Sequence, residues 1–183
     1  CPDALYDSWY INSPVISQSQ YADFFFQDLI PFVSKVAHID TKNIFITGLS
    51  MGGHGALYLF SLRPELFRSA GSISGVLELG PVRNEYRIKE YLGLNGSNKD
   101  KELLEKFSVA GNIGKIASAG KEIIFSCGTS DWFFPMNEQF RHLCEEAKIK
   151  ATYIIGPGGH YYPYWKTAVS LHFAFFKDRI ISH

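Results

Sequence analysis

The chain has 183 residues, and this length predicts one domain. Its 18 Lys and Arg balance its 18 Asp and Glu, so the formal net charge is zero, which argues against nucleic-acid binding and against attachment to a membrane by charge. No apolar run approaches the roughly 20 residues that span a bilayer. The first residues include neither a Met nor a basic segment followed by an apolar one, so we expect a processed or cut chain.

Turn-forming residues dominate the N-terminus and predict a loop that carries Trp9 and Tyr10. Apolar residues then recur every three or four positions over 20–37, which predicts an amphipathic helix with Ser19 as its N-cap. Pro31 lies inside this pattern and is expected to kink or split the helix, because proline lacks the N–H group that a helix interior uses.

Four short apolar runs predict buried strands, and three helical patterns alternate with them. This alternation is typical of an α/β fold with a mostly parallel sheet and helices on both faces. Residues 75–121 are charged and rich in Gly and Asn, and they predict a cap-like insertion over the C-terminal edge of the sheet, within a single domain of residues 1–183. The expected strands are 44–47, 69–74, 123–127 and 152–155, and the expected helices are 52–62, 137–147 and 165–181.

A Gly-x-Ser-x-Gly pattern, formed by Gly48, Ser50 and Gly52, lies between the first strand and the helix after it. In that context the pattern predicts a nucleophile elbow, a sharp turn that lifts the serine hydroxyl clear of the sheet. Side chains at positions 48 and 52 are expected to collide with neighbouring backbone, which would explain both glycines. The backbone amide of Met51 is expected to stabilise an oxyanion. The alternative is an inert serine in a tight strand–helix turn.

A serine nucleophile needs a base, and in this class of fold the order along the chain is Ser, acid and His. Asp131 follows the strand at 123–127 in a tight turn, and we predict it as the acid. His160 follows the strand at 152–155 after Gly-Pro-Gly-Gly, and we predict it as the base. The alternatives are a solvated turn aspartate and a turn histidine. The other histidines lie on expected helices or at the C-terminus, and His54 is expected to pack or hydrogen-bond just past the elbow.

Three motifs together resemble those of the esterase D-like family of α/β-hydrolases: Gly-Leu-Ser-Met-Gly-Gly at 48–53, Cys-Gly-Thr-x-Asp at 127–131 and Pro-Gly-Gly-His at 157–160. The segment 7–14 is also similar to the loop before that family's first long helix. The family includes S-formylglutathione hydrolases, tributyrin esterases, feruloyl esterases and acetyl xylan esterases. The resemblance covers nearly the whole chain, and it implies that the Ser, Asp and His of these motifs are nucleophile, acid and base.

The chain departs from the family at its start. Family members begin with several strands and a loop containing His-Gly, which supplies a second oxyanion-hole amide, and they have about eight strands. This chain begins near the end of what should be a central strand, and only four strands are expected in it. The resemblance therefore implies missing N-terminal strands. Either a second chain or fragment supplies them, or the chain is a cut or incomplete form.

Together these residues predict a serine carboxylesterase that hydrolyses short-acyl or carbohydrate-linked esters, of acetyl or feruloyl type, through an acyl-enzyme. Trp9, Tyr10, Trp132 and Tyr161 are expected to bind the substrate, and Phe133 is expected to lie near the site with them, the alternative being ordinary core aromatics. Two other functions compete with this one. The first is an acyltransferase or thioesterase of the same fold, and the second is a catalytically impaired homologue or fragment that binds a carbohydrate or a partner.

Cys1, Cys127 and Cys144 are an odd number of cysteines and lie far apart in the sequence. Their spacing fits neither a metal site nor a disulfide framework. We expect free thiols, with Cys127 buried, and neither a metal nor another cofactor.

Overall fold

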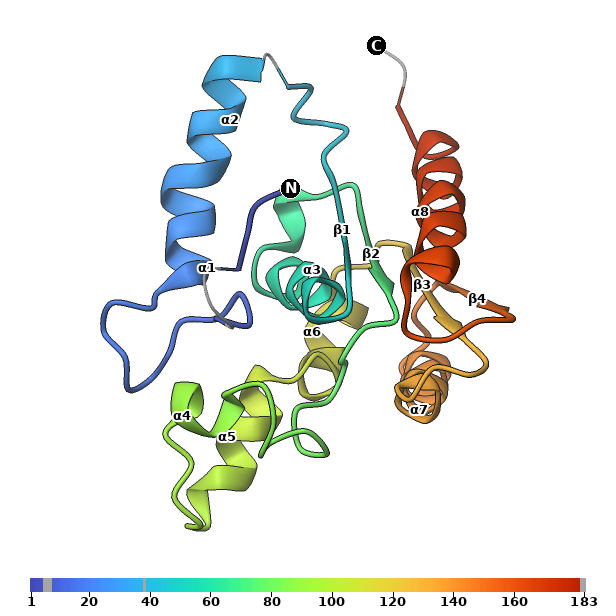
Figure 1. The fold of residues 1–183 in the computed structure, drawn as a ribbon. Coiled ribbons are helices and arrows are strands. Elements are labelled where there is room, and N and C mark those ends of the chain that lie inside the picture. Colours follow the sequence, from blue (N-terminus) through green and yellow to red (C-terminus); the bar gives the residue numbers. More distant parts are fainter. Residues whose placement is uncertain (5–7, 38, 182–183) are drawn as a thin grey trace.

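Four parallel strands form one sheet, and their order in the sheet is their order along the chain (Figure 1). The computed structural model describes residues 1–4, 8–37 and 39–181, so Asp7, His38 and His183 lie outside it. The parallel sheet that the alternating pattern predicts is confirmed. The strands are β1 (Phe45–Leu49), β2 (Ser69–Ile73), β3 (Ile123–Gly128) and β4 (Ala151–Gly156).

β1 is an edge strand among the described residues, because it pairs only with β2. All residues of β2 and β3 are buried, whereas those of β1 are partly exposed and Leu49 reaches 37%. The expectation of a buried strand was wrong for β1, since no described strand lies on its outer side, and for β4, where Thr152 and Ile155 are exposed. An edge of this kind presents unpaired backbone N–H and C=O groups.

Helices cover both faces of the sheet, as predicted. On the face with the largest apolar core, α3 (Met51–Leu62) packs against β1 and β2, and α7 (Phe134–Glu146) packs against β3 and β4. On the other face, α8 (Tyr162–Lys177) packs against the first three strands. Burial on both faces explains why β3 is an apolar run rather than an alternating pattern.

α7 and α8 each begin three residues earlier than predicted, at Phe134 and Tyr162. Pro135 and Pro163 lie in their first turns, where a proline is favourable because the N–H that it lacks would have no partner within the helix. None of the described helices combines the length and the apolar character that crossing a bilayer requires.

The N-terminal helix runs through the whole predicted span but changes type along it. It consists of α1 (Tyr21–Phe24), a π-helical segment η1 (Phe25–Leu29) and α2 (Ile30–Ala37). The π-helical turn directly precedes Pro31, where the α-helical hydrogen bond is lost, so the helix widens rather than splits. The N-cap is Gln20, without a side-chain cap bond, so the expectation for Ser19 was wrong.

Residues 75–121 contain four short helices, of which α4 and α5 lie at one end of the molecule (Figure 1). The imidazole of His54 on α3 lies 2.9 Å from the Phe107 carbonyl, and this bond joins the segment to the elbow helix. That this segment acts as a cap over the site stays a prediction. The helices are α4 (Ile88–Leu92), α5 (Lys99–Phe107), η3 (Ala110–Asn112) and α6 (Ile113–Ser118).

Candidate active site

Ser50 forms a sharp turn between β1 and α3, with φ of 54° and ψ of −117°. Such angles cost a serine about 1–3 kcal/mol, and the surrounding structure must impose them. A Cβ atom on Gly48 would lie 2.3 Å from the Gly52 carbonyl oxygen, so only glycine fits at position 48. At Gly52 the nearest atom to a Cβ would be the Tyr10 hydroxyl at 3.5 Å, which is ordinary contact. The collision expected at position 52 was therefore wrong.

The structure brings Ser50, His160 and Asp131 together. His160 Nε2 lies 2.9 Å from Ser50 Oγ, and His160 Nδ1 lies 3.0 Å from Asp131 Oδ2. A carboxylate accepts hydrogen bonds, so the neutral imidazole carries its proton on Nδ1 and leaves Nε2 free to accept the serine proton. The Asp131 side chain is fully buried and that of His160 is 10% exposed, so little water competes for these bonds.

The Asp131 carboxylate is stabilised in its charged form. Burial alone would raise the pKa of this carboxyl, but the hydrogen bonds from His160 and from the Phe133 amide, at 2.9 Å, outweigh burial and hold the pKa below its usual value. The carboxylate therefore stays ionised at neutral pH, where it orients the imidazole and would stabilise its protonated form.

Backbone hydrogen bonds fasten the loop that carries Asp131 to the loop that carries His160. The Thr129 amide donates to the Gly156 carbonyl at 2.9 Å, and the Ser130 amide donates to the Gly158 carbonyl at 2.8 Å. The loops approach so closely that a Cβ atom on Gly128 would lie 2.3 Å from the Gly158 carbonyl oxygen. The separation of acid and base is thus set by main-chain geometry rather than by flexible side chains.

Met51 begins α3 directly after Ser50. The N–H groups of a first helical turn have no acceptor within the helix, and the helix dipole adds partial positive charge there. The Met51 amide is therefore a donor suited to an oxyanion formed at Ser50.

Of the four predicted substrate contacts, two are well exposed. Trp132 is 66% exposed and stacks on the His160 ring at 5.0 Å between centroids, and Tyr161 is 50% exposed. Tyr10 is half-buried and packs along the first turns of α3, close to Gly52 and Gly55.

Trp9 does not reach the surface, which corrects the expectation that it binds substrate. It is 2% exposed, its ring meets His54 edge-on, and its Nε1–H donates to the Tyr86 carbonyl at 3.0 Å. It is a core aromatic, the alternative that its residue type had left open.

Two further rings enclose the imidazole, and sequence reasoning placed Phe133 near the site but missed Trp165. Phe133 and Trp165 meet the His160 ring edge-on, at 5.2 and 4.9 Å between centroids. Both positions carried a signal, since Phe133 follows Asp131 by two residues and Trp165 follows His160 by five, in the first turn of α8. With Trp132 they exclude water from the base and fix its orientation.

The other described histidines do not take part in this arrangement. Burial lowers the pKa of His54 to about 4 and that of His172 to about 3, so both are neutral at physiological pH. His54 packs and hydrogen-bonds beside the elbow, as predicted, and His172 lies within 3.1 Å of hydroxyls on β1 and β3. No cluster of three or more His, Cys, Asp or Glu side chains among the described residues could hold a metal ion.

A family model described as "Putative esterase" matches residues 3–176. The chain belongs to this esterase family. The S-formylglutathione hydrolase of Arabidopsis thaliana is 24% identical to this esterase-family chain over 155 residues, which cover 82% of the chain and 53% of that protein. The family expected from the motifs is therefore confirmed.

Solved structures resemble this esterase-family chain in fold. A ferulic acid esterase matches with a TM-score of 0.76 at 21% identity, over 93% of this chain and 64% of its own. A fluorophosphonate-binding serine hydrolase of Staphylococcus aureus matches with a TM-score of 0.78 at 20% identity, over 93% of this chain and 68% of that protein. These identities show the α/β-hydrolase fold alone. The chain spans about half the length of the curated relative it matches and about two thirds of these structures.

Proposed function

We propose that the protein is a serine carboxylesterase in which Ser50 is the nucleophile, His160 the base and Asp131 the acid. The observation that carries this proposal is one imidazole within 3.0 Å of both a serine hydroxyl and a buried carboxylate. The serine stands on a strained strand–helix turn, which supports a nucleophile rather than a structural serine.

The reaction follows from these positions. Ser50 Oγ attacks the ester carbonyl while His160 Nε2 takes its proton, and the Asp131 carboxylate stabilises the resulting imidazolium. The Met51 amide donates to the oxyanion of the tetrahedral intermediate. His160 then returns the proton to the leaving alcohol, and an acyl-enzyme remains on Ser50. A water molecule, activated by the same imidazole, releases the acid and restores the serine.

The substrate class that we propose is a short-acyl or carbohydrate-linked ester. Exposed aromatic rings support it, because Trp132 and Tyr161 beside the base offer flat surfaces on which a sugar or phenolic ring can stack. A binding protein without turnover is the competing function. The observation that favours it is that the Met51 amide is the one oxyanion donor next to Ser50 in the part of the chain that the structure describes, since the loss of one donor costs about 10²–10³ in rate.

Covalent labelling separates these two functions. A fluorophosphonate probe phosphonylates a serine only when a base activates it, so we expect a single adduct on Ser50 of the folded wild-type protein and none on the Ser50→Ala variant. The site of the adduct is read by peptide mass spectrometry. Folded wild-type protein that takes up no label would favour the binding protein.

We further propose that strands from outside residues 1–183 complete the sheet at β1. Support comes from the open edge of β1 and from exposed apolar side chains on α2 and on α8, of which α8 packs against β1. Phe32 is 61% exposed on α2, and Phe173 is 63% exposed on α8. An open apolar edge invites pairing or aggregation, and an added segment would also be the source of the second oxyanion amide.

Intact-mass analysis and size-exclusion chromatography of the active material test this proposal. We expect active material to contain polypeptide beyond these 183 residues, and we expect the 183-residue chain alone to aggregate or to turn over ester slowly. Hydrogen exchange gives an independent measure, with β1 amides protected in the active material to the same degree as those of β2. A monodisperse monomer of 20.7 kDa with full esterase turnover would overturn the proposal.

A further inference from the structure

A cleft of about 560 Å³ lies beside Trp132, between the start of the 75–121 segment and the start of α7. Its walls are largely apolar, and three aromatic rings belong to them: Trp132, Phe133 and Tyr86. Two of these rings are well exposed, Trp132 at 66% and Tyr86 at 48%. The size suits a small ring-bearing ligand group, since ligand pockets begin at roughly 300 Å³.

The two walls of the cleft are held in place from behind. Met136 Sδ accepts the backbone N–H groups of Leu77 and Glu78 at 3.1 and 3.3 Å, which joins α7 to the opposite wall. Tyr86 is fixed through its carbonyl by the buried indole of Trp9. Its backbone has φ of 49°, a conformation that costs energy and recurs at ligand-binding positions. Trp9 thus acts as a positioning residue, and the cleft is preformed.

The cleft lies on the side of the site where an alcohol would leave. Trp132 is both a lining residue of the cleft and the ring stacked on His160. In the proposed mechanism the imidazole delivers its proton to the leaving oxygen, so the alcohol portion of the ester departs beside His160. A ring attached to that alcohol is within reach of the cleft.

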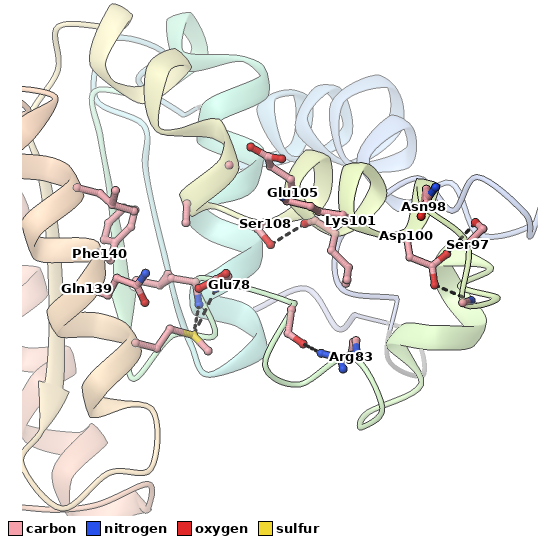
Figure 2. Close-up of a pocket in the computed structure, with 18 residues that line it drawn as sticks. Glu78, Arg83, Ser97, Asn98, Asp100, Lys101, Glu105, Ser108, Gln139 and Phe140 are labelled. Carbon is pink, nitrogen blue, oxygen red and sulfur yellow. Dashed lines mark hydrogen bonds between the residues drawn. The ribbon is translucent and has the colours of Figure 1, made fainter.

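The charge in the cleft is negative. Glu78 and Glu85 are the ionisable acids among its described lining residues, and these include no Lys or Arg. Arg83 and Lys101 instead line a neighbouring cavity of about 960 Å³, which Figure 2 shows with Glu78 and Gln139 on its α7 side. An anionic group in the cleft would therefore meet two carboxylates of like charge, and the penalty would rise at low ionic strength.

We propose that this cleft binds a neutral aromatic ring on the alcohol portion of the substrate ester, and that Glu78 and Glu85 select against anionic alcohols. The inference rests on the proposed function, because the proposed mechanism decides on which side of the site the alcohol leaves. Stacking between Trp132 and Tyr86 supplies the attraction, and the two carboxylates supply the discrimination.

Binding of product-like alcohols to the Ser50→Ala protein tests the cleft without turnover. The probes are 2-naphthylmethanol and its anionic analogue 6-(hydroxymethyl)-2-naphthoate, titrated by NMR with the full protein at low salt. Adding Trp132→Ala is expected to weaken 2-naphthylmethanol binding about tenfold, because stacking and apolar contact are lost. Adding Tyr162→Ala removes an aromatic ring of similar exposure, 69% against 66%, outside the cleft and is expected to change binding less than about twofold.

A separate variant tests whether the two carboxylates select against an anion. We expect the anion to bind at least about fivefold more weakly than the neutral alcohol, and the Glu78→Gln, Glu85→Gln double variant to abolish most of that difference. Equal binding of both probes to the parent protein would overturn the charge selection. If the Ser50→Ala protein bound 2-naphthylmethanol with equal affinity with and without Trp132→Ala, the proposal that the cleft binds the ring would be overturned.

Kinetics keep this inference separate from the proposed function. These measurements use protein in which Ser50 is intact. Benzyl acetate and 4-carboxybenzyl acetate have leaving groups of similar reactivity. A higher kcat/KM for benzyl acetate that is lost in the Glu78→Gln, Glu85→Gln double variant therefore supports the cleft. Tight, Trp132-dependent binding of the alcohol in a protein without any esterase activity would support a ring-binding cleft and overturn its assignment to a leaving group. Esterase activity with no preference between these esters would leave the proposed function standing and overturn the selection.

Discussion

Replacing Ser50 with alanine is expected to lower the hydrolysis of p-nitrophenyl acetate by a factor of about 10³ or more, while the protein stays folded. The hydroxyl is the only atom group lost, and without it the imidazole at 2.9 Å has no nucleophile to activate. Alanine also suits the turn no worse than serine, since both residues have a Cβ atom and face the same strain at φ of 54°. The measurement is steady-state kinetics, and the melting temperatures of the variant and the wild type are compared to show that the variant is folded.

The matched control is Ser130→Ala, which removes an exposed hydroxyl from the loop next to Asp131. The Ser130 backbone amide donates to Gly158, and this bond survives the substitution. We expect activity within about twofold of wild type. If Ser50→Ala kept more than about a tenth of the wild-type rate, Ser50 would not be the nucleophile.

Local signals were sufficient for much of the site. The motif around Ser50 predicts a strand, a turn and a helix together, because an apolar run precedes it, Gly48 permits the close approach of the turn, and a helical pattern follows. Asp131 and His160 follow the third and fourth strands, and the carboxyl ends of parallel strands share one edge of a sheet. Their approach could thus be anticipated without knowing the distances, although the backbone bonds that join the two loops could not.

The position of Trp9 could not be predicted from local sequence. An aromatic residue in an N-terminal loop fits a ligand site and a core equally well, and the choice depends on packing against His54 and Tyr86, which lie far away in sequence. The prediction of the N-cap was wrong for a related reason. Ser19 has a suitable residue type, but its backbone amide and carbonyl form hydrogen bonds with Ile16 and Ser13 in the preceding loop. The prolines that directly follow Phe134 and Tyr162 are the sequence signal for these two helix starts, because proline is favoured in a first helical turn.

Replacing Asp131 with asparagine is expected to lower kcat by about 10³–10⁴ with little change in fold. The reason lies in the two partners of the carboxylate. Oδ1 accepts the Phe133 amide at 2.9 Å, and Oδ2 faces His160 Nδ1 at 3.0 Å. The asparagine oxygen must stay with the Phe133 amide, because the reverse orientation would oppose two donors in a buried site at a cost of about 1–3 kcal/mol.

The asparagine NH₂ group would therefore face His160 Nδ1 and donate to it. That contact favours the tautomer with its proton on Nε2, where the imidazole can no longer accept the proton of Ser50. The loss is thus expected in kcat and in the rate of fluorophosphonate labelling alike, because both depend on the same proton transfer. Asp178→Asn, at an exposed position after α8, is the matched control for removing one charge. A tenfold or smaller loss with Asp131→Asn would mean that the carboxylate does not set the tautomer, and Asp131 would then be a structural partner of the Phe133 amide rather than the acid of the site.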